Sequence, residues 1–328
     1  MTARQALPWG LPAQRRRYRE GLVAVEERLR TVAGAYPGQL GDACRRTLAA
    51  GGKRVRPLLT LLSAHRARPL GPAVVHAAAA VELVHMATLV HDDVLDRAEL
   101  RRGRATVAHE FGVELALSTG NYLLARAFSE LAATGSGEAV DLLSATAVGL
   151  SEGELLQRRE AFDVALSVAA YEHRCRLKTA DLFAAAARLG AGLSGLPARD
   201  QDALGQFGRL IGLAFQVFDD ILDLSGDEAR TGKRLGADIR DGTITLPLIF
   251  ALEERPGLAA RLRDGGRLDA AAVGQLIEEV RASGALQRAR GAALAHVDGA
   301  RRALEECSDD VERDLLAQVA RTVVDRFS

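Results

Sequence analysis

The sequence has no net charge and no nucleotide-binding motif, and each absence narrows the possible functions. Among its 328 residues, Lys and Arg total 43, and Asp and Glu also total 43. A chain balanced in this way exerts no long-range pull on nucleic acid or on an anionic membrane. Neither a Walker P-loop nor a GxGxxG fingerprint occurs, so nucleotide use has no support. Any function that depends on charge must therefore come from local clusters.

Cysteines are also scarce, and no apolar stretch is free of polar residues over the length of a membrane span. The three cysteines are Cys44, Cys175 and Cys307, and they form no CxxC pair. Residues 15–17 are arginines followed by a charged stretch, unlike a secretory signal peptide. Residues 73–90 are interrupted by His76, Glu82 and His85, which a bilayer would penalise. We therefore expect a protein of the reducing cytoplasm without a transmembrane segment.

Strand patterns are nearly missing, whereas helix-forming residues dominate. Runs that alternate Val, Ile or Thr with polar residues are rare, and Ala, Leu, Arg and Glu are abundant. Glycines and prolines recur at intervals that separate long helical segments. No linker or low-complexity block divides the chain. The sequence predicts an all-α fold and a single domain over residues 1–328, with residues 1–20 as a peripheral N-terminal arm.

Two segments are apolar on almost all sides, and each runs into a group of aspartates. Residues 74–90 precede one DDxxD motif, and residues 207–218 precede another. A helix that is apolar all round belongs in the centre of a large bundle. The motif aspartates are Asp92, Asp93 and Asp96 in the first cluster and Asp219, Asp220 and Asp223 in the second.

The two aspartate clusters predict a magnesium site. The first and last aspartates of DDxxD are four residues apart and share a helix face. Carboxylates so close together repel one another, and oxygen-only ligands suit a hard cation such as Mg²⁺ together with substrate phosphates. The alternative for one cluster is a solvated acidic helix end, but two matched clusters behind buried helices disfavour it. Neither cluster has the spacing of an EF-hand loop.

Basic residues beside glycines indicate where phosphates would bind. Lys53 and Arg56 follow Gly51-Gly52 at a predicted helix start, and backbone N–H groups at such a start favour anions. Further basic residues follow the clusters or lie in a helical stretch, namely Arg101, Arg102, Lys178 and Lys233. Each alone is more often a surface charge. Two acidic clusters with separate basic groups fit diphosphate substrates.

The chain resembles the trans-isoprenyl (polyprenyl) diphosphate synthases from about residue 20 onward. Nine blocks stand in the family's order: GGKRVRPLL, ELVHMATLVHDDVLD, RRGRAT, GNYLLARAF, EGELLQ, KTADLF, FQVFDDILD, GKRLGADI and TLPL. The resemblance implies a large helical bundle of the isoprenoid synthase type around a deep central cavity, usually as a homodimer. It also implies a Mg²⁺-dependent prenyltransferase that condenses isopentenyl diphosphate with an allylic diphosphate such as farnesyl or geranylgeranyl diphosphate.

The resemblance assigns roles residue by residue. It places all six motif aspartates on Mg²⁺. It places Lys53, Arg56, His85 and Arg102 at the isopentenyl diphosphate site, and Arg101, Lys178, Thr179, Gln216 and Lys233 at the allylic site. Oxygens of Thr179 and Gln216 would stabilise an allylic cation while Lys178 holds the leaving group, and residues 226–242 would form a lid. Thr243 departs from the family, where many members carry lysine.

Product length is predicted from the residues one to two turns before Asp92. Val84, Ala87 and Thr88 would line the path of the growing chain, and the small Ala87 leaves it open. The sequence therefore predicts a product of C30 to C50. The alternatives are a geranylgeranyl diphosphate synthase, a terpene cyclase, and a subunit of a heteromeric synthase. The second DDxxD and the Lys53/Arg56 block argue against a cyclase, and the intact aspartates argue against a purely regulatory subunit.

Overall fold

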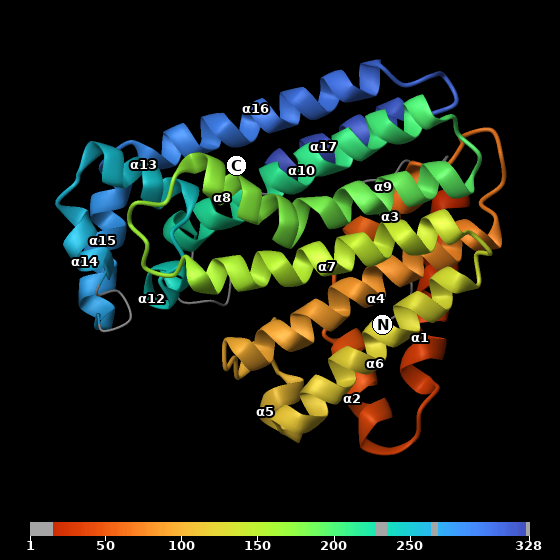
Figure 1. The fold of residues 1–328 in the computed structure, drawn as a ribbon, viewed down its shortest axis with the longest axis horizontal. Coiled ribbons are helices and arrows are strands. Elements are labelled where there is room, and N and C mark those ends of the chain that lie inside the picture. The colour runs from red at the N-terminus through yellow and green to blue at the C-terminus, as the bar shows by residue number, and fades with distance from the viewer. Residues whose placement is uncertain (1–15, 227–234, 264–267, 326–328) are drawn as a thin grey trace. The chain divides into compact units, whose positions relative to one another are not determined.

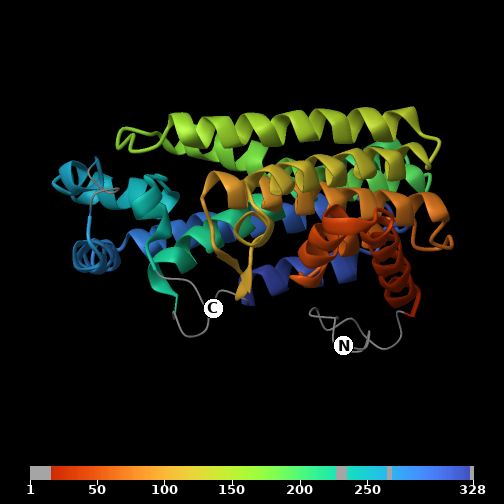
Figure 2. The same ribbon diagram turned by 90° about the horizontal axis from the view of Figure 1, so that it is seen from below.

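Helices account for nearly all of the regular structure in the computed structural model, which describes residues 16–226, 235–263 and 268–325 (Figures 1 and 2). The helices are α1 (Arg16–Gly34), α2 (Gly38–Ala49), α3 (Val55–Leu62), α4 (Pro72–Leu95), α5 (Val107–Phe111), α6 (Val113–Ala132), α7 (Gly137–Arg159), α8 (Val168–Cys175), the π-helix η2 (Arg176–Ala180), α9 (Asp181–Leu193), α10 (Ala198–Ser225), α12 (Ala237–Asp241), α13 (Leu246–Glu254), α14 (Leu258–Arg263), α15 (Ala270–Arg281), α16 (Ala285–Glu305) and α17 (Arg313–Asp325). The prediction of an all-α fold is confirmed.

The described residues contain two strands, and these form one short hairpin. Strands β1 (Leu100–Arg101) and β2 (Arg104–Ala105) pair antiparallel, with Leu100 opposite Ala105. Gly103 has φ +72° and Arg102 has φ 54°, so the turn between the strands uses left-handed backbone. Glycine adopts that conformation without strain, which explains its place in the RRGRAT block.

The chain divides into two compact units. Unit 1 comprises Met1–Ala145, Ala185–Gly205 and Glu306–Gln318, and unit 2 comprises Thr146–Ala184, Gln206–Glu305 and Val319–Ser328. Each unit carries one aspartate cluster. Of the predicted arm over residues 1–20, residues 16–20 are described, and they form the start of α1.

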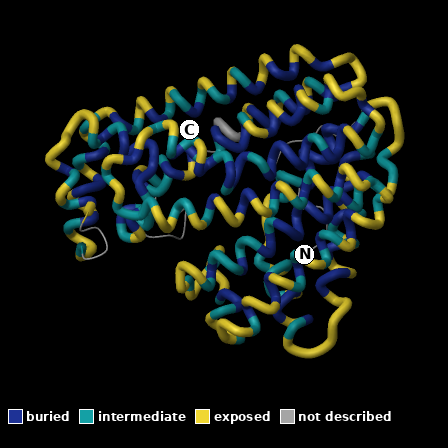
Figure 3. Tube along the Cα trace, in the orientation of Figure 1, coloured by how far each residue is buried: buried dark blue, intermediate teal, exposed yellow. Residues whose placement is uncertain are grey.

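In unit 1, the long helix α4 packs along α6, as Figure 1 shows. Buried and partly buried positions follow one another along α4, whereas the turn between α1 and α2 is exposed (Figure 3). The approach of the two helices requires Gly120, since a Cβ there would lie 2.2 Å from Nε2 of His91. By length and composition α4 is a candidate membrane span, but 67% of its most apolar window is buried within the protein.

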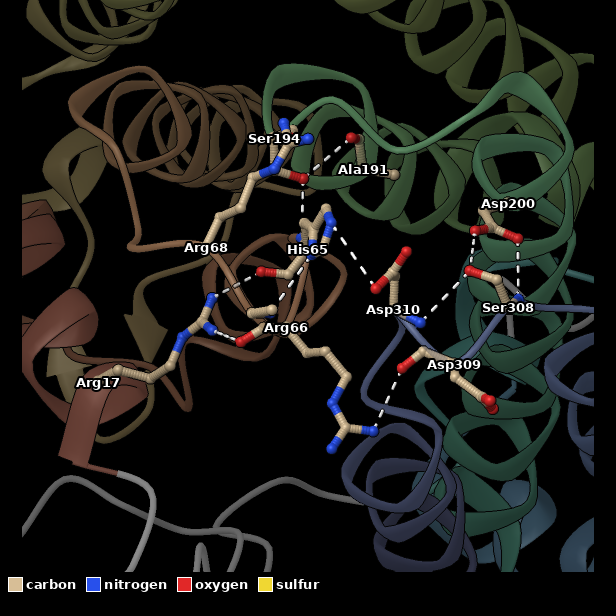
Figure 4. A network of polar contacts seen from close by, with 11 residues as sticks. Arg17, His65, Arg66, Arg68, Ala191, Ser194, Asp200, Ser308, Asp309 and Asp310 are labelled. Carbon is tan, nitrogen blue, oxygen red and sulfur yellow. Dashed lines mark hydrogen bonds and ion pairs between the residues drawn. The ribbon is translucent and has the colours of Figure 1, made fainter.

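A polar network of unit 1 ties the loop after α3 and the loop before α17 to helices α1 and α10 (Figure 4). Arg17 on α1 donates to the backbone carbonyl groups of His65 and Arg66, in the loop between α3 and α4. The backbone N–H of Arg66 donates to the carbonyl oxygen of Asp310 at 2.8 Å. The hydroxyl of Ser308 donates to the buried carboxylate of Asp200 at 2.5 Å. One arginine of the run 15–17 therefore joins α1 to the loop after α3.

In unit 2, α13, α14 and α15 lie together, and α13 also packs against α16. The apolar half of α10 forms much of the core of this unit, because Phe207, Ile211, Ala214 and Phe218 are all buried. A glycine lets α10 approach the segment η2 closely. A Cβ at Gly212 would lie 2.6 Å from the Cα of Ala180 in η2. This packing holds η2 against the turn of α10 that leads into the second aspartate cluster.

Candidate functional site

The first aspartate cluster lies at the C-terminal end of α4. Asp92 is half-buried, Asp93 is buried and Asp96 is the exposed residue that caps the helix. Backbone carbonyl groups at a helix C-terminus disfavour negative charge, by roughly 0.3–1 kcal/mol for each exposed group. A cation offsets part of this cost, since Nε of Arg101 lies 2.7 Å from Oδ1 of Asp93. The β1–β2 hairpin thus places the side chain of Arg101 against the first aspartate cluster.

Arginines also gather around His85, on the same helix and two turns before the cluster. The pKa of His85 is well below its usual value because the ring is desolvated by burial and lies near Arg56, Arg102, Arg101 and Arg54. The imidazole is therefore neutral at neutral pH and can donate a hydrogen bond without adding charge. Guanidinium groups around a neutral donor suit a multiply charged anion, although two of the four, Arg54 and Arg101, already pair with carboxylates.

One buried carboxylate organises this arginine group. Glu82, one turn before His85 on α4, accepts a bond of 2.8 Å from Nη1 of Arg54. Arg54 also donates to Glu26 on α1 at 2.5 Å and adopts φ 50°, which is strained for a residue with a side chain. Gly52 packs against the same groups, because a Cβ there would lie 2.9 Å from Nη1 of Arg54. The glycine-led loop is thus anchored to two helices.

Lys53, Arg56 and Arg102 occupy different environments within this arginine-rich region. Lys53 is exposed and Arg56 is half-buried at the start of α3. Arg102 is exposed, and its guanidinium donates to the carbonyl oxygen of Gly51. Burial lowers the pKa of Arg56, Glu82 opposes that shift and Arg102 reinforces it. Unit 1 therefore brings Arg56, His85 and Arg102 together.

The second aspartate cluster lies in the last two turns of α10. Asp219 is exposed, Asp220 is only 4% exposed and Asp223 is half-buried. The hydroxyl of Tyr171 donates to Oδ2 of Asp220 at 2.5 Å, and Nε2 of Gln216 donates to Oδ1 at 2.9 Å. Burial nevertheless raises the pKa of Asp220 to about 7, and the neighbouring Asp219 adds to the shift.

A fourth carboxylate joins this cluster. Asp223 accepts hydrogen bonds of 3.1 Å from the backbone N–H groups of Ala237 and Asp238, and so begins α12. Burial raises the pKa of Asp238 well above its usual value, and Asp223, Asp220 and Asp219 raise it further. Sequence reasoning assigned Asp238 no role, although it lies in the quoted block GKRLGADI. Asp238 lies 15 residues after Asp223, the last aspartate of the motif, and no local sequence pattern connects the two residues.

The carboxylates of unit 2 fit a divalent cation. Like charges that raise one another's pKa are relieved when a cation binds among them. Within the described ranges, no three acidic, histidine or cysteine side chains form a complete set of metal ligands on their own. Mg²⁺ does not need such a set, since it retains waters and binds through a few carboxylates together with substrate phosphates.

Lys178 and Thr179 lie in the π-helix η2 rather than in a regular helix. Such one-turn π segments often occur at functional sites. Nζ of Lys178 lies 2.5 Å from Oε2 of Glu154 on α7, and the hydroxyl of Thr179 donates to Oε1 of Gln216 at 2.8 Å. A Cβ at Gly153 would lie 2.6 Å from the backbone nitrogen of Lys178, so the EGELLQ block needs its glycine. The structure thus brings Thr179 and Gln216 together.

The remaining predicted residues lie as follows. Val84 and Ala87 are buried on α4, and Thr88 is half-buried, with its hydroxyl donating to the carbonyl oxygen of His85 at 2.9 Å. Thr243 follows α12, and its N–H donates to the carbonyl oxygen of Asp238 at 2.8 Å. Lys233 and the other residues of the segment 227–234 within the predicted lid lie outside the described residues.

Comparisons with known proteins show the family to which the chain is related. A family model described as polyprenyl synthetase matches residues 37–280. The chain is 37% identical over 301 residues to heptaprenyl diphosphate synthase component 2 of Geobacillus stearothermophilus, covering 92% of this chain and 94% of the relative. It is 36% identical over 312 residues to the nonaprenyl diphosphate synthase of Mycobacterium tuberculosis, covering 94% and 93%. A solved polyprenyl synthase from Caulobacter crescentus CB15, complexed with calcium and isoprenyl diphosphate, has a TM-score of 0.88 and 35% identity, covering 95% of this chain and 97% of that chain.

Proposed function

Because the chain belongs to the polyprenyl synthetase family, we propose that it is a Mg²⁺-dependent prenyltransferase. It condenses isopentenyl diphosphate with an allylic diphosphate to give a trans-polyprenyl diphosphate. One observation carries this proposal: unit 1 holds a carboxylate cluster and, around His85 two turns earlier, a group of arginines, one of which, Arg101, also pairs with Asp93. A terpene cyclase would need the first but not the second, because it binds a single diphosphate.

The aspartates hold the metal ions in this proposal. Asp92, Asp93 and Asp96 bind Mg²⁺ on the allylic diphosphate, and Asp219, Asp220 and Asp223 bind further Mg²⁺. When bound, Mg²⁺ supplies Lewis-acid stabilisation of the charge on the leaving diphosphate. The raised pKa values of Asp220 and Asp238 support this role, since they reflect negative charge that a cation would offset. The relative solved with calcium and isoprenyl diphosphate gives independent support.

The chain's own residues bind and orient the two substrates. Lys53, Arg56, His85 and Arg102 hold isopentenyl diphosphate, while Arg101, Lys178 and Lys233 hold the allylic diphosphate. The allylic C–O bond breaks, and its electron pair leaves with the diphosphate. Oxygens of Thr179 and Gln216 stabilise the resulting allylic cation. The hydrogen bond between these two side chains supports their assignment as catalytic residues.

Bond formation follows from the same arrangement. The double bond of isopentenyl diphosphate attacks the cation and forms the new C–C bond. A proton then leaves the isopentenyl unit, and the released diphosphate accepts it, so no side-chain base is required. Water must be excluded because it would capture the cation. We propose that residues 226–242, which include Lys233, close over the substrates.

The product is of medium to long chain, C30 to C50. The relatives named above are a heptaprenyl and a nonaprenyl diphosphate synthase. The small, buried Ala87 and its neighbour Val84 support a path along α4 for the growing chain, and Thr88 continues the same surface. All three cysteines are buried free thiols, which supports a place in the reducing cytoplasm.

The active assembly is a homodimer in our proposal, with one specific alternative. The relative from Geobacillus stearothermophilus is named as component 2 of its synthase, which favours a heteromeric enzyme as the second candidate. The two assemblies make opposite predictions for the purified chain. A homodimer is active alone, whereas a component of a heteromer acquires activity only when its partner is added.

Turnover of labelled isopentenyl diphosphate tests the proposal. The purified chain is incubated with Mg²⁺, farnesyl or geranylgeranyl diphosphate and labelled isopentenyl diphosphate, and the products are separated by chain length. We expect all-trans products of C30 to C50 and none without Mg²⁺. Products that stop at C20 would identify a geranylgeranyl diphosphate synthase. No incorporation by the chain alone or with a candidate partner would contradict prenyl transfer.

A further inference from the structure

Tyr171 is a fully buried residue to which the proposed mechanism gives no role. It lies on α8, its side chain is 1% exposed, and its hydroxyl donates to Oδ2 of Asp220 at 2.5 Å. The thiol of Cys175, one turn further along α8, also lies within hydrogen-bonding reach of this hydroxyl. A buried tyrosine hydroxyl needs a polar partner. Here that partner is a residue of the second aspartate cluster.

Further hydrogen bonds connect Asp220 to two other side chains. Its other carboxylate oxygen, Oδ1, accepts a hydrogen bond from Nε2 of Gln216 at 2.9 Å. The opposite end of that amide, Oε1, accepts from the hydroxyl of Thr179 at 2.8 Å. A continuous chain of hydrogen bonds therefore runs from Tyr171 through Asp220 and Gln216 to Thr179, entirely within unit 2.

This chain fixes which end of the Gln216 side chain lies beside Thr179. The NH₂ end of the amide faces Asp220, because Nε2 of Gln216 donates to Oδ1 of that carboxyl group. The carbonyl oxygen is then placed next to the hydroxyl oxygen of Thr179. Asp220 can impose this orientation only while its own carboxylate is held, and the hydroxyl of Tyr171 supplies the bond that holds its second oxygen.

We infer that Tyr171 is a positioning residue for the ionisation of the allylic substrate. By holding Asp220 in one orientation, it keeps the carbonyl oxygen of Gln216 and the hydroxyl oxygen of Thr179 side by side, ready for the positive charge that develops. This inference rests on the proposed function, in which those two oxygens stabilise the cation. Fixed dipoles of this kind act without reorganising during the reaction, which is why their prior orientation matters.

The test is a double-mutant cycle between Tyr171 and Gln216. Tyr171→Phe removes only the hydroxyl, and we expect kcat to fall roughly 10–100-fold, the usual cost of losing a partner that orients an active-site ligand. KM for isopentenyl diphosphate should not change. In the background of Gln216→Ala, adding Tyr171→Phe should have little further effect, because residues that act through one another are not additive.

The matched control is Tyr18→Phe, which deletes an equally buried hydroxyl on α1 and should leave kcat unchanged. If Tyr171→Phe does not fold, Cys175→Ala tests the same contact from its other side. It should cause a smaller loss of kcat that likewise disappears with Gln216→Ala. A kcat equal to that of the wild type in Tyr171→Phe, or losses that add in full to that of Gln216→Ala, would overturn the inference. A wild-type chain that is inactive both alone and with a candidate partner would instead contradict the proposed function itself.

Discussion

The two aspartate clusters share one motif but differ in what surrounds them. In unit 1, the buried Asp93 pairs with Arg101 in a region rich in arginine. In unit 2, the buried Asp220 receives hydrogen bonds from the neutral groups of Tyr171 and Gln216, and its pKa rises to about 7. The protein thus supplies a cation to its first cluster, whereas the second gains most from a cation that comes from outside. An identical motif can therefore have opposite electrostatics.

The largest effect should come from the aspartates themselves. Asp92→Asn and Asp219→Asn should each lower kcat/KM roughly a thousandfold, because several kcal/mol of charge stabilisation disappear with each ligand. Steady-state kinetics at several Mg²⁺ concentrations measures this. Asp141→Asn, an exposed substitution on α7, is the control and should behave as wild type. Retention of most activity in either cluster variant would remove that cluster from the metal site.

A smaller effect should follow when the first aspartate cluster loses the guanidinium group of Arg101. Arg101→Gln should raise KM for the allylic diphosphate roughly 10–100-fold, as loss of a partner of a metal ligand commonly does. The control is Arg104→Gln, because Arg104 is exposed and lies opposite Arg101 in the β1–β2 hairpin. Equal kinetic changes in the two variants would mean that the hairpin contributes only general positive charge.

The helices that lead into the clusters differ as well, and this difference predicts product length. Four residues before the first motif aspartate, α4 carries Thr88 whereas α10 carries Phe215. One position earlier both helices carry an alanine, Ala87 and Ala214. We expect Ala87→Val and Ala87→Tyr to shorten the product progressively. Overpacking of this buried position should cost about 1–3 kcal/mol of stability. Chromatography of the products measures their length, and an unchanged distribution would show that the chain does not grow past Ala87.

The pH dependence of stability should have opposite signs in the two units. The folded-state pKa of Asp220 is raised to about 7. The stability of the fold should therefore fall as the pH rises from about 4 through 7, because the buried carboxyl group must then ionise. In unit 1, burial raises the pKa of Glu130, but hydrogen bonds from Arg28 and His76 outweigh it and lower the pKa. The stability that Glu130 contributes is therefore lost as the pH falls through its folded-state pKa.

Thermal unfolding without metal measures both slopes. Asp220→Asn should flatten the decline in Tm between pH 5 and 8, and Glu130→Gln should flatten the acid limb below that range. Added Mg²⁺ should also reduce the decline, because it binds the ionised carboxylates. A wild-type Tm that rises steadily from pH 5 to 8 without metal would contradict the raised pKa of Asp220.

Much of the fold and part of the candidate site follow from sequence because their signals are local. The apolar runs predict the central helices, and the spacing of each DDxxD predicts which aspartates belong together. The partner of Asp220 does not follow, since Tyr171 is 49 positions away and no periodicity links them. Likewise, nothing local indicates that Arg54 adopts a left-handed backbone, or that Asp238 joins the second cluster.

The η2 segment is another feature that the local sequence predicts only in part. The composition around Lys178 and Thr179 predicts a helix, and the chain is helical there, but with one wider turn. That turn arises where Gly153 and Gly212 let α7 and α10 approach the segment closely. Tertiary packing of this kind decides local geometry after propensity has chosen the type of element.

The most direct test compares two matched substitutions in metal-free protein at pH 8. Asp93→Asn deprives Arg101 of its partner and should destabilise the fold by about 1–3 kcal/mol. Asp220→Asn removes a buried negative charge and should stabilise the fold, by on the order of 1–3 kcal/mol. Chemical denaturation of the two variants and the wild type gives both free energies of unfolding. Opposite signs are the predicted result, and a loss of stability in both variants would contradict the account.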